Sequence, residues 1–406
     1  MKIAIVTASS LPMPPVNGGA VENLIDIILK HNEITNEHKF IVYSCKSQNA
    51  LEKSKEYKNT KFIYLDTESI LYKLKKGKLH LANKVSSKYY GNSFIREVIK
   101  SLRKESENFD AIIVENRPEY CIKIREVFKG KIYLHLHNDL LNKNTKYSNE
   151  IIESVDEIYT VSNYIKNRVK TIDNNIYVKT LYNGVDIEIF NKDLYINERN
   201  SLRQKYGFKS EDNVFIFSGR LNAAKGIDKF LEAFVELPDQ LNAKLLIVGS
   251  SIYGQTKEDD FLKKLKEISN KKKKNIVFTG YVDYKDIPKI HVTSDIAVIP
   301  SIWEDPSPLT VYEAMASGFP IITTNSGGIP ELVNSECAIV INRNKDIIQE
   351  FKRAMIKLLK DPKLREDMSI NSRNRSKEFS KEQFCLNFLK EINKTNNNTE
   401  NDNIWI

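Results

Sequence analysis

Short apolar runs alternate with amphipathic stretches along most of the chain. Lys2–Ala8 is such a run, and from Ala20 the apolar residues Val21, Leu24 and Ile28 recur at helical spacing. Short continuous apolar runs are typical of strands that a parallel sheet buries on both faces. Their alternation with helices predicts an α/β fold with parallel sheets. The other strands expected in the first half are Phe40–Ser44, Phe62–Leu65, Ala111–Val114, Ile132–His135 and Ile158–Val161.

A charged, strand-free segment, Asn191–Asn213, interrupts this pattern, which then begins again. We therefore expect two Rossmann-like, doubly wound domains that face a cleft, with ligands beyond the carboxyl ends of the strands. The expected domains are 1–193 and 194–376, followed by a helix at 377–395 that packs back on the first domain and a frayed tail at 396–406. The strands expected in the second half are Val214–Ser218, Lys244–Val248, Ile276–Thr279, Ile296–Pro300 and Ile321–Thr324.

Composition places the chain among folded proteins. Of its 406 residues, 41% are hydrophobic and 28% are charged, which does not fit a disordered chain. We find neither a signal-peptide pattern nor an apolar run long enough to span a membrane. The four scattered cysteines suggest buried thiols in a reducing compartment, so we expect a cytoplasmic protein. The net charge of +9 suits anionic partners such as phosphorylated ligands, an anionic membrane or nucleic acid.

A first chemical cluster follows the strand that ends at Ser218. Gly219 and Arg220 come next, and Lys225 and Gly226 precede an amphipathic helix. The free N–H groups of a helix start favour an anion, and an Arg with a Lys suits a diphosphate. The alternative is an exposed basic loop without a ligand.

A second cluster, Glu304–Gly318, joins a strand to a helix expected to begin near Leu309. Asp305 lies in the loop and Glu313 about one turn into the helix. Carboxylates accept hydrogen bonds from hydroxyls, so the two acids could serve a sugar and a ribose, with the helix N-terminus facing phosphates. The alternative is a capping acid and a solvated glutamate.

The stretch from Gly219 to Glu331 closely resembles the donor domain of family 4 retaining glycosyltransferases, which are glycosyl transferases of group 1 with the GT-B fold. The resemblance implies that Arg220 and Lys225 hold the diphosphate, Glu313 binds the ribose and Asp305 contacts the sugar. The matching motifs, in order, are G-R-L-x-x-x-K-G at 219–226, F-T-G-Y-V at 278–282, S-D-I-A-V-I-P-S at 294–301, the acid-x7-Glu motif at 305–313, E-A-M-A-S-G at 313–318 and G-G-I-P-E at 327–331.

One departure concerns the wall of the sugar pocket. Asp305 replaces the usual Glu, and Pro306-Ser307-Pro308-Leu309-Thr310 replaces the usual Pro-Phe-Gly-Leu-Val. The identity of the donor sugar therefore stays open. The full expected donor site is Gly18, Gly19, Gly219, Arg220, Lys225, Tyr281, Asp305, Ser307, Pro308, Leu309, Thr310 and Glu313.

In the first half, Gly18-Gly19 lies where similar enzymes place a glycine loop near the donor phosphates, although a plain turn is the alternative. His135 and His137 end another expected strand. Because side chains alternate across a strand, we expect only one of them to face the cleft. The resemblance favours His137, facing the reacting sugar, with His135 packed inside. The expected catalytic residues are thus His137, Asp305, Arg220 and Lys225.

Weaker signals point to the acceptor. Glu115, Asn116 and Arg117 end a strand, and Asn138 follows His137, so we place these four residues on the acceptor side. Asn183-Gly184-Val185-Asp186 matches a family signature, which we interpret as structural.

The expected reaction is transfer of a hexose or N-acetylhexosamine, from a UDP-sugar rather than a GDP-sugar, to a surface-glycan or lipid-linked acceptor. Retention follows from the resemblance. Without an Asp-x-Asp motif we expect no metal and no cofactor, because Arg220, Lys225 and helix N-termini balance the leaving-group charge. The alternatives are a nucleotide-sugar epimerase and a non-catalytic sugar-nucleotide-binding subunit. A nucleic-acid partner is not expected, and no signal indicates an oligomeric state.

Between Ser69 and Arg96 the chain has no acidic residue, and apolar and tyrosine side chains are interleaved with lysines. Such a surface suits the anionic inner face of a membrane. A solvated basic loop is the alternative. The lysines are Lys73, Lys75, Lys76, Lys78, Lys84 and Lys88.

Overall fold

The computed structural model describes residues 1–16, 18–105, 109–251, 259–343 and 346–401. Within these ranges the side chains of Ile70, Leu71, Lys73, Lys75, Glu105 and 395–401 are not described.

The chain forms two compact units. The first unit consists of Met1–Tyr182 and Cys385–Ile406, and the second of Asn183–Phe384. We expected the boundary after residue 193. The division falls earlier because residues just after Tyr182 contact the end of the second unit: Val185 pairs with Ser380, and the Asn183 side chain donates to the Ser307 carbonyl at 3.1 Å.

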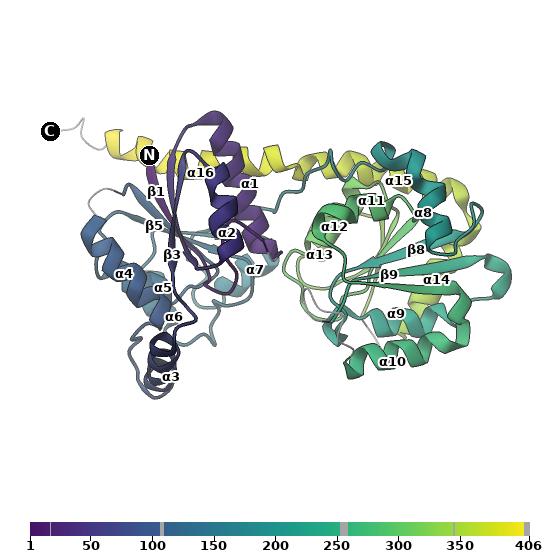
Figure 1. The fold of residues 1–406 in the computed structure, drawn as a ribbon, viewed down its shortest axis with the longest axis horizontal. Helices are drawn as coiled ribbons and strands as arrows, with labels where there is room; N and C mark the ends of the chain where they lie inside the picture. Colours follow the sequence, from purple (N-terminus) through teal and green to yellow (C-terminus); the bar gives the residue numbers. More distant parts are fainter. Residues whose placement is uncertain (17, 106–108, 252–258, 344–345, 402–406) are drawn as a thin grey trace. The chain divides into compact units, whose positions relative to one another are not determined.

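The first unit is built on a seven-stranded parallel sheet of order β3-β2-β1-β4-β5-β6-β7 (Figure 1). The order reverses between β1 and β4, as in doubly wound folds, where ligands bind beyond the carboxyl ends of the strands. The strands are β1 (Lys2–Val6), β2 (Lys39–Cys45), β3 (Thr60–Leu65), β4 (Ala111–Glu115), β5 (Lys131–Leu136), β6 (Glu157–Thr160) and β7 (Val178–Thr180).

Helices bury both faces of this sheet. Phe94 and Tyr120, on two of these helices, pack in the same core as Ile112 and Leu134 of the sheet. The helices are α1 (Ala20–Thr35), α2 (Gln48–Lys53), α3 (Ile70–Val85), α4 (Ser93–Glu105), α5 (Tyr120–Arg125), α6 (Ser148–Glu153), α7 (Asn163–Val169) and α16 (Lys381–Asn401), whose first residues belong to the second unit.

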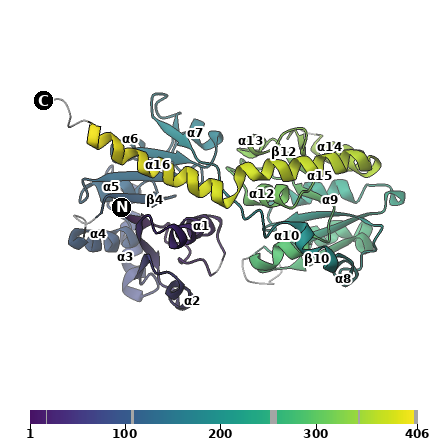
Figure 2. The same cartoon turned by 90° about the horizontal axis from the view of Figure 1, so that it is seen from above.

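Helix α16 returns to the first unit, where it lies beside α1 (Figure 2). The Cys385 thiol points to the Ile27 carbonyl of α1 at 3.6 Å. Further along, Phe388 packs on His135, and Glu391 forms an ion pair with Lys179 at 2.5 Å. The helix continues beyond residue 395, and residues 402–406 of the expected tail lie outside the described residues.

The second unit repeats the plan with a six-stranded parallel sheet of order β10-β9-β8-β11-β12-β13. Its order reverses between β8 and β11, again creating a switch point. The sheet contains β8 (Asn213–Ser218), β9 (Ala243–Val248), β10 (Ile276–Gly280), β11 (Ile296–Ile299), β12 (Ile321–Thr324) and β13 (Ala338–Ile341).

Phenylalanines fill the core on one face of this second sheet, where Phe230 and Phe234 pack on Phe215, and Phe351 packs on Phe230. The helices of the unit are α8 (Arg199–Lys205), α9 (Ile227–Phe234), α10 (Asp260–Ser269), α11 (Ile287–His291), α12 (Leu309–Ala316), α13 (Ile329–Leu332), α14 (Ile347–Lys360) and α15 (Pro362–Ser376).

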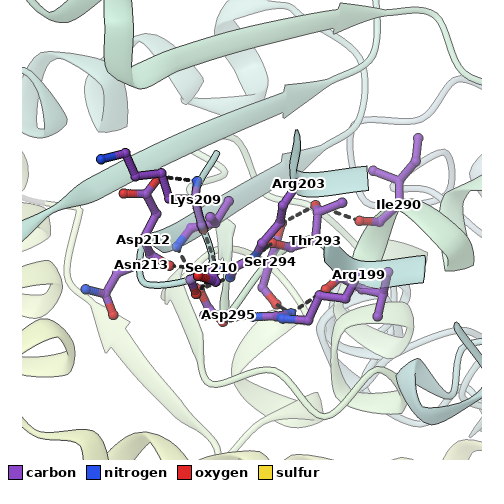
Figure 3. A network of polar contacts seen from close by, with 12 residues as sticks. Arg199, Arg203, Lys209, Ser210, Asp212, Asn213, Ile290, Thr293, Ser294 and Asp295 are labelled. Carbon is purple, nitrogen blue, oxygen red and sulfur yellow. Dashed lines mark hydrogen bonds and ion pairs between the residues drawn. The ribbon is translucent and has the colours of Figure 1, made fainter. Parts of the chain in front are cut away.

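A network around the buried Arg203 anchors the first α-helix of the second unit (Figure 3). Arg203 and Arg199 reach opposite oxygens of Asp295 at 2.8 and 2.5 Å, and Asp295 also accepts the backbone N–H of Val214 in β8. Asp295 directly precedes β11, so the network lies at the amino ends of the strands, away from the carboxyl edge. It fixes α8 to the sheet.

Every strand expected from the sequence is present, with ends shifted by at most two residues. β7 and β13 were not expected. Both are short edge strands: β7 has one apolar residue in three, whereas β13 is entirely apolar and was overlooked. The four cysteines are free and buried. No helix in the described part of the chain is both long and apolar enough to cross a membrane.

Candidate functional site

The loops that follow β8, β11 and β12 meet at the carboxyl edge of the second sheet, because these three strands are neighbours. They carry the expected residues Gly219, Arg220, Lys225 and Asp305. This parallel arrangement brings together residues that lie far apart in the sequence.

The loop after β8 packs tightly against the end of β11. Gly226 has a left-handed backbone with φ 66°, and a Cβ atom there would lie 1.9 Å from the Pro300 carbonyl oxygen. The Ile302 N–H also donates to the Ala224 carbonyl at 3.0 Å. Only glycine allows this approach, which holds Lys225 beside the next loop.

Lys225 and Asp305 form a direct ion pair, with Nζ to Oδ2 at 2.5 Å. Asp305 is buried, whereas Lys225 is half-buried. The expected phosphate ligand and the expected sugar ligand thus contact each other. Such a charge pair at a helix start can separate and bind a polar ligand from both sides.

Two hydrogen bonds clamp the neighbouring Glu304 carboxylate. Arg343 donates to one oxygen at 2.5 Å, and the Gly327 N–H donates to the other at 2.6 Å. Burial acts to raise the pKa of Glu304, but these two donors outweigh it and lower the pKa. The Gly328 N–H completes the clamp by donating to the Asp305 carbonyl at 2.9 Å. The loops after β11 and β12 are therefore held together.

The expected helix start is confirmed, since α12 begins at Leu309. Ser307 and Pro308 are buried, while Leu309 and Thr310 are half-buried. The Ser307 hydroxyl lies 2.6 Å from the Tyr312 hydroxyl of α12. Ser307 therefore supports the loop from inside.

Glu313 is buried in the middle of α12, with 4% of its surface exposed. Burial raises its pKa to about 7, although a hydrogen bond with Tyr284 opposes the rise. Burial and the nearby Glu313 raise the pKa of the Tyr284 hydroxyl in turn. A carboxylate in this setting is a hydrogen-bond acceptor whose charge changes near neutral pH. Tyr284 was not expected from the sequence.

The remaining expected donor residues of this unit lie closer to the surface. Arg220 is exposed and Gly219 is half-buried, both directly after β8. Tyr281 is exposed directly after β10, at the same edge of the sheet.

In the first unit, the expected glycine loop precedes α1. Gly18 and Gly19 both have left-handed backbones, with φ 74° and 114°. A Cβ atom on Gly19 would lie 2.2 Å from a carboxylate oxygen of Glu22. Burial raises the pKa of Glu22 despite a bond from its own backbone N–H, and Glu115 adds to the rise. Glu22 was missed, although it is an acid in the first turn of an expected helix.

His135, His137 and Glu115 form a buried cluster at the carboxyl edge of the first sheet. Glu115 ends β4 and pairs in register with His135 of β5. The Glu115 Oε2 atom lies 2.8 Å from His137 Nε2 and 3.2 Å from His135 Nδ1. Our expectation that the two histidines point to opposite faces is wrong, because residues two apart along a strand place their side chains on the same face, and both imidazoles lie against the Glu115 carboxylate.

The ionisation of this cluster follows from its burial. Burial acts to raise the pKa of Glu115, but His135 and His137 outweigh it and lower the pKa to about 2. Burial, with a contribution from His135, lowers the pKa of His137 to about 4. At neutral pH, therefore, Glu115 is an anion and His137 is uncharged.

The expected acceptor-side residues divide into buried and accessible ones. Glu115 is buried against the histidines and offers no surface to an acceptor. Asn116 is also buried, and its side chain accepts the backbone N–H of His137 at 3.1 Å. Arg117 and Asn138 are half-buried, and Arg117 donates to the Ala8 carbonyl at 3.4 Å. Asn116 therefore shapes the loop, and Asn138 and Arg117 are the more accessible pair.

A comparison with known protein families found a match within the second unit. Residues 198–375 match the family Glycosyl transferases group 1. This segment carries Arg220, Lys225, Asp305 and Glu313, and it is a domain of that family.

Known proteins resemble longer parts of the chain. The spore coat protein SA of Bacillus subtilis (strain 168) is 28% identical over 363 residues, which cover 87% of this chain and 86% of that protein. An Escherichia coli UDP-Gal:alpha-D-GlcNAc-diphosphoundecaprenol alpha-1,3-galactosyltransferase is 32% identical over 219 residues, 50% of this chain and 53% of that protein. The crystal structure of Anabaena Alr3699/HepE with UDP has a TM-score of 0.75 at 18% identity, covering 97% of this chain and all of that one. The two Rossmann-like units thus have the GT-B fold.

Proposed function

We propose that this protein is a retaining glycosyltransferase acting in the cytoplasm, at the inner face of the membrane. It moves a hexose or N-acetylhexosamine from a nucleotide-diphosphate sugar, with UDP as the favoured nucleotide, to a surface-glycan or lipid-linked acceptor. The observation that carries the proposal is the Lys225–Asp305 pair, which joins the loop before α9 to the loop before α12 within the group 1 domain.

In this proposal the donor replaces the Lys225–Asp305 contact. Lys225 and Arg220 bind the diphosphate, and the freed Asp305 carboxylate accepts hydrogen bonds from sugar hydroxyls. Glu313 accepts the ribose hydroxyls. As the bond to the sugar breaks, negative charge grows on the diphosphate, and the two cations stabilise it without a metal ion.

The first unit supplies His137 to the reacting sugar. Its Nε2 atom is engaged by Glu115, so a hydroxyl approaches Nδ1. Arg117 and Asn138 contact the acceptor. Gly18 and Gly19 allow the backbone to approach the donor, and Glu22 beside them restricts what fits there.

Two names among the similar proteins support the choice of nucleotide and acceptor. The Anabaena structure contains UDP, and the Escherichia coli relative is named for UDP-Gal and a diphosphoundecaprenol acceptor.

A donor panel tests the proposal. Purified protein is incubated with UDP- and GDP-linked hexoses and N-acetylhexosamines, and nucleotide release is measured. We expect slow hydrolysis of a UDP-sugar, faster when an acceptor is present. An epimerase would release no nucleotide but would change the sugar, and a binding subunit would do neither.

Variants of Asp305, measured with the same donor panel, test whether this residue contacts the sugar. Asp305→Asn keeps the shape but removes the charge, so we expect slower release with every donor. Asp305→Glu restores the usual family residue, and we expect a changed preference among sugars. If both variants keep the wild-type rate and preference, Asp305 is not a sugar contact.

The basic segment of α3 supports the membrane part of the proposal. Leu74, Leu81 and Val85 are 62%, 65% and 82% exposed. Lys76, Lys78 and Lys84 of α3, and Lys88 shortly after its end, are exposed and form no ion pair with a described residue. The side chains of Lys73 and Lys75 lie outside the described residues. Apolar and basic side chains on one exposed helix suit an anionic membrane surface.

Liposome flotation tests this surface. We expect wild type to float with anionic but not with neutral vesicles, and a variant with Lys76, Lys78, Lys84 and Lys88 changed to Gln to stay unbound. A control variant changes the lysines at 271–274 of the second unit to Gln, which removes the same charge elsewhere. Equal binding by both variants would contradict a role for α3.

A further inference from the structure

We propose that Glu115, His135 and His137 of the first unit form a binding site for a transition-metal ion of the Zn²⁺ type. The three side chains offer one carboxylate oxygen and two imidazole nitrogens, and these ligand atoms all lie within 4.8 Å of one another. All three residues are buried.

The fold itself brings the ligands together. Glu115 and His135 are register partners at the carboxyl ends of neighbouring strands. His137 follows the end of β5, where Asn116, with a left-handed φ of 54°, accepts its backbone N–H. The Asn116 N–H donates to the His135 carbonyl at 2.8 Å. These backbone bonds hold both imidazoles on the Glu115 carboxylate.

His135 is the observation that separates a metal site from a hydrogen-bonded cluster. It is 1% exposed, and neither of its ring nitrogens has a hydrogen-bond partner among the described residues. Its Nδ1 atom is close to Glu115, but the geometry is not that of a hydrogen bond. A buried polar group without a partner is unfavourable, so native structures rarely keep one. A bound cation would supply the missing partner.

Glu115 points to the same conclusion. Its carboxylate is 1% exposed, and no Lys or Arg among the described residues forms an ion pair with it. The two histidines are its ionic contacts. A divalent ion would balance this buried charge and draw on all three side chains.

The chemical types of the three ligands indicate which metal ions the site would prefer. Mg²⁺ and Ca²⁺ prefer oxygen ligands, whereas two imidazoles and one carboxylate suit Zn²⁺, Co²⁺ or Ni²⁺. Tetrahedral Zn²⁺ with bonds of about 2 Å holds its ligand atoms roughly 3.3 Å apart. The distances of 2.8 and 3.2 Å from Glu115 to the two nitrogens are close to this spacing. A fourth position remains for water or another donor.

The test is metal binding by the folded, tag-free protein after removal of metals with a chelator. Co²⁺ is titrated while its visible absorption is followed, and Zn²⁺ is then added as a competitor. We expect one Co²⁺ per chain, displaced by Zn²⁺, and a rise in melting temperature with Zn²⁺. In Glu115→Gln, His135→Gln and His137→Gln we expect binding at least tenfold weaker.

The matched control is His80→Gln, an exposed histidine of the same unit, which should bind Co²⁺ as wild type does. Circular dichroism shows whether each variant is folded, and for a variant that does not fold the remaining single variants give the answer. The proposal is overturned if wild type binds no ion at one per chain, or if folded variants of the cluster bind as tightly as wild type. Neither result bears on the Lys225–Asp305 pair, on which the proposed function rests, because both residues belong to the second unit.

Discussion

The carboxyl edges of the two sheets use charge differently. In the second unit, Lys225 pairs with the buried Asp305, and Arg343 pairs with the exposed Glu304, within loops that glycines hold close together. In the first unit, Glu115 and two histidines are buried. The comparison shows that the carboxyl edge of a doubly wound sheet can carry partly exposed ion pairs or a fully buried cluster, depending on the loops.

The largest expected effect tests the close packing of the second edge. Gly226→Ala adds a Cβ atom 1.9 Å from the Pro300 carbonyl oxygen, in a left-handed backbone. Overlap and backbone strain together should lower the free energy of unfolding by more than about 3 kcal/mol. Urea unfolding measures this loss.

Gly207→Ala is the control, because Gly207 also has a left-handed backbone but no atom lies near the position of its missing Cβ. About 1 kcal/mol is expected there, and equal losses in both variants would show that contact with β11 does not matter.

The next effect concerns the buried charge of Glu313. Its pKa in the folded protein is about 7, raised from 4.5. The protonated form is therefore favoured in the folded state, and this stability is present below pH 4.5 and is lost as pH rises through 7. Between pH 5 and pH 8 we expect wild type to lose about 3 kcal/mol more than Glu313→Gln. Urea unfolding at both pH values measures the difference.

The control for this prediction is Glu366→Gln, which removes an exposed glutamate of the same unit. It should keep the wild-type pH dependence. If Glu313→Gln also keeps it, then Glu313 does not titrate in this range.

Lys225→Met tests whether the carboxyl edge of the second sheet binds the diphosphate of the donor. Loss of a charged hydrogen bond costs about 1.5–3 kcal/mol, so turnover should fall roughly tenfold to hundredfold, and Arg220→Ala should act similarly. Nucleotide release measures it, with circular dichroism to confirm folding. Lys229→Met is the control, since Lys229 forms an ion pair within α9 instead. Normal turnover in a folded Lys225→Met variant would contradict a donor site in this loop.

The smallest expected effect is that of added Mg²⁺ or Mn²⁺. In the second unit Asp305 contacts Lys225, Glu304 contacts Arg343, and Glu313 contacts Tyr284, so each acid has a partner already. After chelator treatment, either ion should change the rate of nucleotide release less than about twofold. A large restoration of rate by Mn²⁺ would show that the diphosphate needs a metal after all.

Sequence reasoning succeeded where the signal is local. The helix start at Leu309 and the central strands follow from neighbouring residues alone, and both are confirmed. The Lys225–Asp305 contact joins positions 80 residues apart, and no sequence pattern tells which side chains meet. The two histidines were misplaced because the alternation rule was misapplied: only neighbouring residues alternate, whereas His135 and His137 are two apart and lie on the same side.

The division of the chain has a consequence for its synthesis. Residues 183–384 are one uninterrupted stretch, whereas the first unit joins Met1–Tyr182 to a helix at the far end of the chain. A ribosome therefore finishes the whole second unit before it releases the residues that cover His135 and pair with Lys179. The unit that is translated first is the last to be completed. A stop codon after residue 384 would spare the second unit and leave the first without its covering helix.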